Sequence, residues 1–232
     1  MEKIRTYVDG LDEILGGGLP VGSVTLVTGP PGTMKSTVCY AALHRNAQRG
    51  VRGLYVSLEQ ARDSLERQME GLGYPRGNAG DCLSVLDLSL LHERMEQAGD
   101  RVWLDFFKMY TQSIRQSYPY ELLALDSLDA LEILARFRDH RRDLFHLLQW
   151  LRRLKATCLL IGELPRDSPP EVFSKHREEF LADGILHLRL EKRGEFEVQR
   201  RIRVVKLRGA RHETGYRALV FDGHLRVTQV LA

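Results

Sequence analysis

Short apolar runs alternate along the chain with longer stretches in which apolar residues recur at helical spacing. The apolar runs, which predict buried strands, lie at 24–28, 53–58, 82–88, 120–125 and 157–162. The helical stretches lie at 11–15, 37–48, 61–72, 103–118 and 140–155. Buried strands that alternate with helices predict an α/β fold, in which a mostly parallel sheet is flanked by helices on both faces.

The pattern changes after Phe180. Residues 184–190 alternate between apolar and polar, and a turn at 192–195 leads into a partner strand at 196–206. The dipeptide Asp222-Gly223 is typical of a tight hairpin between two further strands. We therefore expect C-terminal antiparallel strands that extend the sheet. No repeat or linker interrupts the chain, so a single domain is expected over residues 1–232.

Composition narrows the class of protein. The 232 residues are 43% hydrophobic and 28% charged, which suits one well-packed domain. No apolar run approaches the roughly 20 residues that cross a bilayer, and Met1–Arg5 is no signal-peptide core, so a cytoplasmic protein without membrane contact is expected. The three cysteines have no paired spacing, which predicts buried reduced thiols. The eight histidines are scattered, which predicts no zinc site.

The most informative stretch is the loop Gly29-Pro30-Pro31-Gly32-Thr33-Met34-Lys35-Ser36, between a predicted strand and a predicted helix. Such a loop wraps phosphate with backbone N–H groups, and the helix N-terminus adds positive charge. Lys35 would reach the outer phosphates, and the Ser36 hydroxyl would bind Mg²⁺. Met34 replaces a glycine of the motif, and we expect phosphate binding to survive if its φ stays negative. The alternative is a plain Gly/Pro turn with a solvated Lys35.

Acidic residues follow three of the predicted strands, at the edge where open parallel sheets bind ligands. Asp126 is the expected Mg²⁺ ligand, or else an N-cap of the next helix. Ser127 would sense the terminal phosphate or be that cap itself. Glu59 would deprotonate the attacking water, or would simply be a first-turn helix acid. Glu163 is a further candidate for sensing the site.

Basic residues dominate residues 189–212, although the net charge is only +3. Such a stripe suits nucleic acid, the charged face of a two-stranded ribbon, or a subunit contact to acidic phosphate. Phe196 is the only aromatic ring in the stretch, so base stacking has no support there.

Six segments, in this order, resemble the KaiC branch of the RecA-like ATPases: Gly10–Pro20, the loop at 29–36, Val56–Gln60, Leu125–Ser127, Leu181–Gly184 and Lys206–His212. The resemblance implies a RecA-like P-loop NTPase core that assembles into a homo-oligomeric ring, often a hexamer, with ATP and Mg²⁺ between subunits. It implies that Lys206 and Arg208 reach the neighbouring subunit's phosphates, as an arginine finger does. His212 matches a position near the same phosphate.

The resemblance also bears on catalysis. Glu59 matches the first of a pair of glutamates taken as catalytic, and Gln60 stands in place of the second. The autophosphorylation sites of the family's circadian member belong to a domain without a match here, so no kinase activity is carried over. The expected catalytic residues are Glu59, Lys35, Lys206 and Arg208. The expected nucleotide contacts are Gly29, Pro30, Pro31, Gly32, Thr33, Met34, Lys35, Ser36, Thr37, Asp126, Ser127 and His212, with Ser36 and Asp126 on the metal.

The sequence thus predicts a Mg²⁺-dependent ATPase with a regulatory or signalling role. Two alternatives stay open. One is a DNA-binding recombinase paralogue, in which the loops at 136–142 and 165–177 face the centre of a ring and offer Arg136, Arg138, Arg141 and Arg142 to phosphate. A solvated helix face explains the same arginines more simply. The other alternative is a nucleotide-gated scaffold with negligible hydrolysis.

Overall fold

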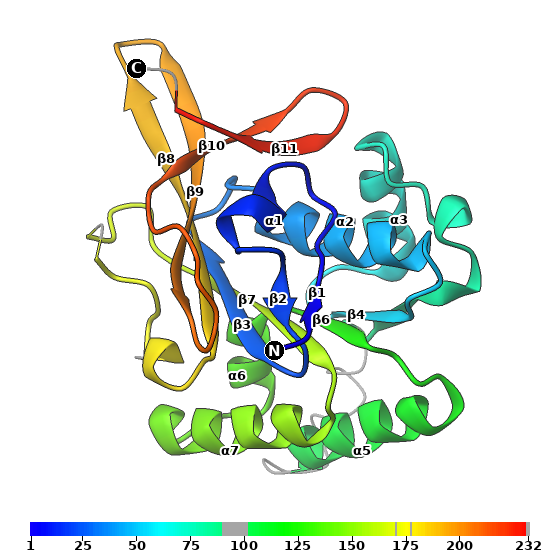
Figure 1. Ribbon diagram of the computed structural model, residues 1–232. Coiled ribbons are helices and arrows are strands. Elements are labelled where there is room, and N and C mark those ends of the chain that lie inside the picture. Colours follow the sequence, from blue (N-terminus) through cyan, green and yellow to red (C-terminus); the bar gives the residue numbers. More distant parts are fainter. Residues whose placement is uncertain (90–101, 170, 177, 231–232) are drawn as a thin grey trace.

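Figure 1 shows the computed structural model of the chain, which describes residues 1–89, 102–169, 171–176 and 178–230. The strands are β1 (Lys3–Ile4), β2 (Leu19–Pro20), β3 (Val24–Gly29), β4 (Gly53–Ser57), β5 (Leu83–Asp87), β6 (Leu122–Asp126), β7 (Thr157–Glu163), β8 (Gly184–Arg193), β9 (Glu197–Leu207), β10 (Arg217–Phe221) and β11 (Leu225–Thr228). β1 and β2 form a separate ribbon, and the others form one nine-stranded sheet in the order β11-β10-β9-β8-β3-β7-β6-β4-β5.

The strands from β8 to β5 in this order are parallel, and the remaining pairs are antiparallel. The expected α/β class with C-terminal antiparallel strands is therefore confirmed. One detail differs, because β8 runs parallel to β3 and only its other neighbour, β9, is antiparallel to it. The antiparallel part of the sheet therefore begins at β9 rather than at residue 184.

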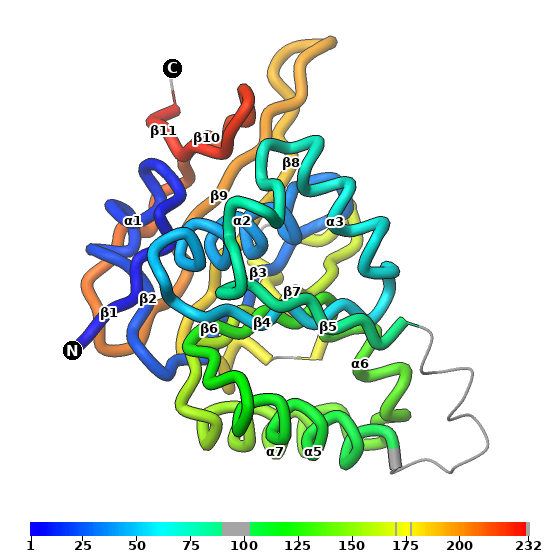
Figure 2. Tube along the Cα trace, turned by 90° about the vertical axis from the view of Figure 1, so that its right-hand side faces the viewer, coloured from blue at the N-terminus to red at the C-terminus, as the bar shows by residue number. Residues whose placement is uncertain are grey.

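Helices cover both faces of the sheet (Figures 1 and 2). α2 (Lys35–Ala47) and α3 (Arg62–Gly71) lie on one face, and α5 (Val102–Ser117) and α7 (His140–Arg153) on the other. α1 (Leu11–Ile14), α6 (Leu128–Leu134) and the 3-10 helices η1 (Arg76–Cys82) and η2 (Glu178–Phe180) are short. No helix of the described ranges is long and apolar enough to cross a membrane.

Each buried strand contributes alternate side chains to two separate cores, as its pleat requires. In β6, Leu122 and Ala124 pack on the side of α2, and Leu123 and Leu125 pack on the side of α5 and α7. Because both faces are covered, the central strands are apolar at every position, which is why they appear in the sequence as continuous runs. The sheet is thereby fixed as a rigid frame for the groups at its edges.

Some elements differ from the expectation. α6 was not among the predicted helices, since its seven residues are too few for a clear periodicity. The β1–β2 ribbon was not predicted either. Of the three cysteines, which are all free thiols, Cys39 and Cys158 are buried and Cys82 is partly exposed.

Candidate functional site

The predicted phosphate loop joins the end of β3 to the start of α2, at the carboxyl edge of the parallel strands. A Cβ atom at Gly29 would lie 2.3 Å from the carbonyl oxygen of Leu188, so only glycine lets the loop start this close to β8. No side chain caps the N-terminus of α2, and its first turn holds no acidic residue. The first N–H groups of this helix are thus left for an anion from outside.

Met34 is where the structure corrects the sequence expectation. Its φ is 71° and its ψ is 32°, which is the left-handed conformation and not the negative φ under which phosphate binding was expected to survive. The loop needs this conformation at the residue just before α2, where the motif has glycine. Met34 therefore keeps the backbone shape of the motif at the cost of strain that glycine would not have.

Lys35 lies inside the loop. Its side chain is buried, and its Nζ donates to the carbonyl oxygens of Gly29 at 2.8 Å and Pro30 at 3.2 Å. Burial lowers the pKa of Lys35, against the opposing charges of Glu163, Asp126 and Asp129. The charges of three carboxylates thus act on the Lys35 ammonium group, and the same carboxylates would attract a divalent cation.

Asp126 ends β6 and is held by Tyr55, whose phenol donates to the carboxylate Oδ2 at 2.5 Å. The Ser36 hydroxyl contacts the same phenol, so both predicted metal ligands lie around one buried group. Burial raises the pKa of Tyr55 well above its usual value, and the Asp126 charge raises it further, which keeps the phenol a donor. Hydroxyl and carboxylate oxygens are the ligands that Mg²⁺ prefers. The residues present therefore fit a magnesium site.

Ser127 is the N-cap of α6, since its hydroxyl accepts from the Ala130 N–H at 3.1 Å. The same hydroxyl donates to the Glu59 carboxylate, which follows β4. The predicted base, Glu59, is therefore in direct contact with the residue next to Asp126, and Asp126 itself is no cap. Gln60 is turned away, because its side-chain amide donates to Ser64 at 2.9 Å and Gln68 at 3.1 Å.

Glu163 ends β7 directly beside Gly29. Its backbone N–H donates to Asp129 Oδ2 at 2.7 Å, and Lys175 forms an ion pair with the other oxygen of Asp129. Asp129 and Lys175 were missed by sequence reasoning, as was Tyr55. Asp129 could have been found as an acid three residues after Asp126, but nothing in the sequence relates Lys175 or Tyr55 to this edge.

Lys206 and Arg208 lie at the opposite ends of the parallel strands, where β3 begins. Arg208 follows β9, and its backbone N–H donates to the Asp183 carbonyl, while the Asp183 N–H donates to Val24 at the start of β3. The five residue steps from Val24 to Gly29 span roughly 16 Å. The structure therefore keeps these cations away from the phosphate loop of their own chain.

Local contacts hold this basic segment. Lys206 donates to the carbonyl oxygens of Glu179 at 2.8 Å and Ala182 at 2.7 Å, and burial lowers its pKa. Arg208 pairs with Asp183 at 3.3 Å and is about half exposed. His212 Nδ1 lies 3.1 Å from the Ala210 carbonyl oxygen, next to the stretch that contacts α1. Lys206 and Arg208 thus lie away from Lys35, and their predicted role toward a neighbouring copy stays a prediction.

The remaining cations of the 189–212 stripe have other surroundings. Arg201 is buried and pairs with Glu191 at 3.0 Å, and Arg189 lies over the Tyr216 ring at 3.9 Å. Arg200 donates to the Gly32 carbonyl oxygen at 3.0 Å, so β9 touches the phosphate loop at its other end. The basic stretch 189–212 is thus divided between the two ends of the parallel strands and is not one continuous basic surface. Arg141 and Arg142 are exposed on the first turn of α7, and Arg177 lies outside the described residues.

A cavity of about 540 Å³ adjoins the phosphate loop at Pro30. Its walls come from the segment after β7 and from the β8–β9 hairpin, and include Pro165, His187, Arg189 and Val198. Ligand pockets commonly have this volume. Of three cavities lined by described residues, it is the one that a residue of the phosphate loop lines.

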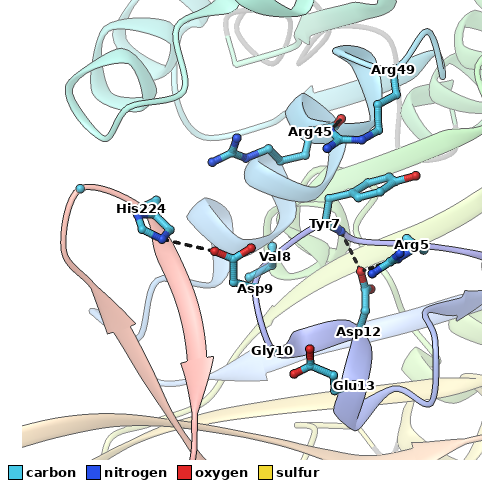
Figure 3. A pocket seen from close by; sticks show the side chains of 11 residues that line it. Arg5, Tyr7, Val8, Asp9, Gly10, Asp12, Glu13, Arg45, Arg49 and His224 are labelled. Atoms are coloured by element: carbon cyan, nitrogen blue, oxygen red, sulfur yellow. Dashed lines mark hydrogen bonds and ion pairs between the residues drawn. The ribbon is translucent and has the colours of Figure 1, made fainter.

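Figure 3 shows a second cavity, of about 690 Å³, near the other end of α2. Arg45 of α2 and Arg49, which follows that helix, face the chain between β1 and α1. Asp12 of α1 accepts from the Tyr7 N–H at 3.0 Å and pairs with Arg5 at 3.4 Å. His224 from the β10–β11 turn pairs with Asp9 at 3.3 Å. The 13 residues of α2 separate this cavity from the phosphate loop by roughly 20 Å. It is therefore no part of the candidate site.

Comparisons with known proteins identify the family of this chain. The family model described as "ATPase: KaiC" matches residues 4–222. The circadian clock oscillator protein KaiC of Picosynechococcus sp. is 31% identical over 225 residues, covering 93% of this chain and 42% of that protein. KaiC 1 of Synechocystis sp. is 29% identical over 224 residues, with the same coverage.

The crystal structure of a KaiC-like protein from the archaeon Pyrococcus horikoshii OT3 has the same fold. It superposes with a TM-score of 0.81 at 24% identity, covering 97% of this chain and 98% of that one. The chain spans about 42% of the length of the curated relatives named above. The family match extends over both edges of the sheet, from the phosphate loop to the Lys206–His212 segment. The chain therefore belongs to the KaiC family of ATPases, within the RecA superfamily.

Proposed function

We propose that this chain hydrolyses ATP, with Mg²⁺, at interfaces between copies of itself in a ring. One observation carries the proposal. The phosphate loop, Asp126 and Glu59 lie at the carboxyl edge of the sheet, while Lys206 and Arg208 lie beside the start of β3. One chain cannot bring both sets to one nucleotide. Two copies can, if the carboxyl ends of the parallel strands in one copy face the amino ends of those strands in the next.

Each residue has a role that follows from its position. The uncapped N–H groups at the start of α2 hold the phosphates, and Lys35 exchanges its carbonyl partners for phosphate oxygens. Ser36 and Asp126 hold the metal, which would neutralise charge on the transferring phosphoryl group. Glu59 takes the proton of the attacking water, with its carboxylate oriented by Ser127. The cavity beside Pro30 takes the nucleoside.

Lys206 and Arg208 of the adjacent copy complete the site. They stabilise the negative charge that builds on the phosphate oxygens as the water attacks. In the single chain their partners are mostly carbonyl oxygens and Asp183, which phosphate can replace. The relatives are named as circadian clock proteins, which favours a regulatory or signalling use of slow hydrolysis.

Substitution of Glu59 tests the base. Glu59→Gln should keep ATP binding within about threefold and lower the phosphate-release rate by about 100-fold or more, as loss of a general base does. Gln60→Ala is the matched control, because its side chain faces α3, and it should leave the rate nearly unchanged. An unaltered rate in Glu59→Gln would remove this residue from the mechanism.

A mixing experiment tests action between copies. Arg208→Ala and Lys35→Ala should each be inactive alone, the first without its finger and the second without phosphate binding. Mixed rings bring an intact Arg208 against an intact loop, so activity should return to a fraction of the wild-type rate. Absence of any recovery, with mixed assemblies verified by mass, would contradict completion of the site by a neighbour.

A further inference from the structure

Three metal-ligating side chains meet at a place that the ATPase chemistry does not use. Glu132 comes from the last turns of α6, His140 is the first residue of α7, and His176 lies in the segment after β7. One ligand atom from each lies within 4.8 Å of the other two. The sequence predicted no zinc site because the histidines are scattered without a ligand motif, and it is the fold that brings these three residues together.

The distances match a tetrahedral centre. His140 Nδ1 lies 3.3 Å from Glu132 Oε2, and His176 Nε2 lies 3.4 Å from the same oxygen. Zinc bonds to nitrogen and carboxylate oxygen are about 2.0–2.2 Å long, so two ligand atoms of a tetrahedron stand about 3.3–3.5 Å apart. Two edges of the tetrahedron are thus already formed. The imidazole rings are stacked, with centroids 3.8 Å apart and 13° between their planes. Because the lone pair of a ring nitrogen lies in the plane of its ring, one of the two rings would turn when both nitrogens bind the ion.

The environment suits a resident ion better than an ordinary ion pair. The Glu132 side chain is only 8% exposed, whereas His140 is 38% and His176 is 35% exposed. His140 Nδ1 is buried and makes no hydrogen bond with any described residue. A metal would use this nitrogen and the buried carboxylate, and an ion could enter from the side of the two half-exposed rings.

We propose that Glu132, His140 and His176 bind one zinc-type divalent ion, whose fourth position is open to water. Two imidazoles and one carboxylate are the ligand set of a catalytic type of zinc centre, and borderline ions prefer it over Mg²⁺ or Ca²⁺. The bound ion would fasten the α6–α7 corner to the segment after β7.

Neighbouring groups already hold the ligands in place. The buried Glu178 accepts from the His176 backbone N–H at 2.8 Å and fixes that residue. Lys175, one residue earlier, pairs with Asp129, which lies one turn before Glu132 on α6. Asp129 in turn holds the N–H of Glu163 beside the phosphate loop. An ion at this centre would thus be connected to the nucleotide site through two side chains.

Direct metal binding tests the proposal without any assay of activity. The untagged full-length chain is stripped with a chelator and titrated with Zn²⁺ in the absence of nucleotide. Excess Mg²⁺ is kept present to occupy oxygen-ligand sites. His140→Ala and His176→Ala are compared with His146→Ala, an exposed histidine on the same helix. Circular dichroism establishes that each variant is folded.

We expect one Zn²⁺ per chain, bound with a micromolar or lower Kd. Loss of either histidine should weaken binding at least about 100-fold, beyond the 10–100-fold that outer-shell changes cost. His146→Ala should bind as the wild type does. Co²⁺ in the same site should give the intense visible absorption of a four-coordinate centre. The proposal would be overturned if the wild type failed to bind Zn²⁺, or if His140→Ala and His176→Ala bound it as tightly as the wild type. A weak six-coordinate Co²⁺ spectrum would overturn it as well.

Discussion

At the scale of single residues, Met34 is the sharpest departure from its motif. Its left-handed backbone should lower the free energy of unfolding by about 1–2 kcal/mol relative to glycine. The greater entropy that glycine loses on folding offsets part of this difference. Met34→Gly and Met34→Ala both remove the long side chain and differ only in the Cβ methyl group of alanine, which is what makes the left-handed conformation costly. We expect the glycine variant to be more stable by about 0.5–1 kcal/mol, measured as the free energy of unfolding in urea.

The control is a position with an ordinary helical backbone. Arg67 is exposed in the middle of α3, and there alanine should be more stable than glycine by about 1 kcal/mol. The order of the two variants should therefore reverse between positions 34 and 67. If alanine were the more stable at both positions, the left-handed conformation of Met34 would be wrong.

Tyr55 and Asp126 are a second case at this scale, because their hydrogen bond joins a buried phenol to a carboxylate. Hydrogen bonds to charged groups contribute about 1.5–3 kcal/mol. A double-mutant cycle of Tyr55→Phe and Asp126→Ala should therefore give a coupling energy of about 2 kcal/mol in urea unfolding. The same cycle with Asp129→Ala, which has no bond to Tyr55, should give less than about 0.5 kcal/mol.

At the scale of elements, β8 and β9 form a hairpin that extends beyond the rest of the sheet (Figure 2). His187 joins this hairpin to its surroundings. Its Nδ1 lies 2.8 Å from the Tyr216 hydroxyl, and its ring contacts Phe173 from the segment after β7. Burial, together with the charges of Arg203 and Arg189, lowers the pKa of His187 to about 4.

This lowered pKa predicts how stability depends on pH. Between pH 6.5 and 4 the unfolded chain binds a proton at His187 that the folded chain does not, so the stability contributed above pH 6.5 is lost as the pH falls. The loss should approach about 3 kcal/mol. His187→Gln should flatten this slope in urea unfolding, while His146→Gln should leave it as in the wild type. Equal slopes in all three proteins would show that His187 binds its proton in the folded state.

At the scale of the whole molecule, the sequence predicted the central parallel strands and many of the residues at their carboxyl ends. The apolar runs mark β3, β4, β6 and β7 because strands covered on both faces must be apolar throughout. Because every such strand points the same way, Asp126 and Glu59 could be placed with the phosphate loop before any coordinates were known. Tyr55 was not predicted, since its hydroxyl is invisible within an apolar run.

What sequence reasoning could not give is the arrangement of residues that meet through the tertiary fold alone. Lys206 and Arg208 were expected to act on a neighbouring copy only through a family resemblance, whereas the strand register places them beside the start of β3. The Glu132, His140 and His176 cluster has no local spacing pattern at all. Such groups depend on strand order and loop paths, and neither follows from periodicity.

The separation of the phosphate loop from Lys206 and Arg208 leads to a prediction about assembly. A nucleotide held by the loop of one copy and by Lys206 and Arg208 of the next would act as a bridge, so ATP should favour the ring by mass action. We expect the mass measured by light scattering to rise from small species toward a ring when ATP and Mg²⁺ are added. Lys35→Ala should stay small because it cannot hold the phosphates.

Arg208→Ala separates bridging from simple binding. This variant keeps its own loop, and Asp183 keeps Arg152 as a partner at 3.1 Å, so the chain should fold and bind ATP. Its ring should nevertheless form only at several-fold higher protein concentration, because one contact of the bridge is missing from every interface. If Arg208→Ala assembled as readily as the wild type, the ring would be held by surfaces other than the nucleotide, and Arg208 would then have at most a catalytic part.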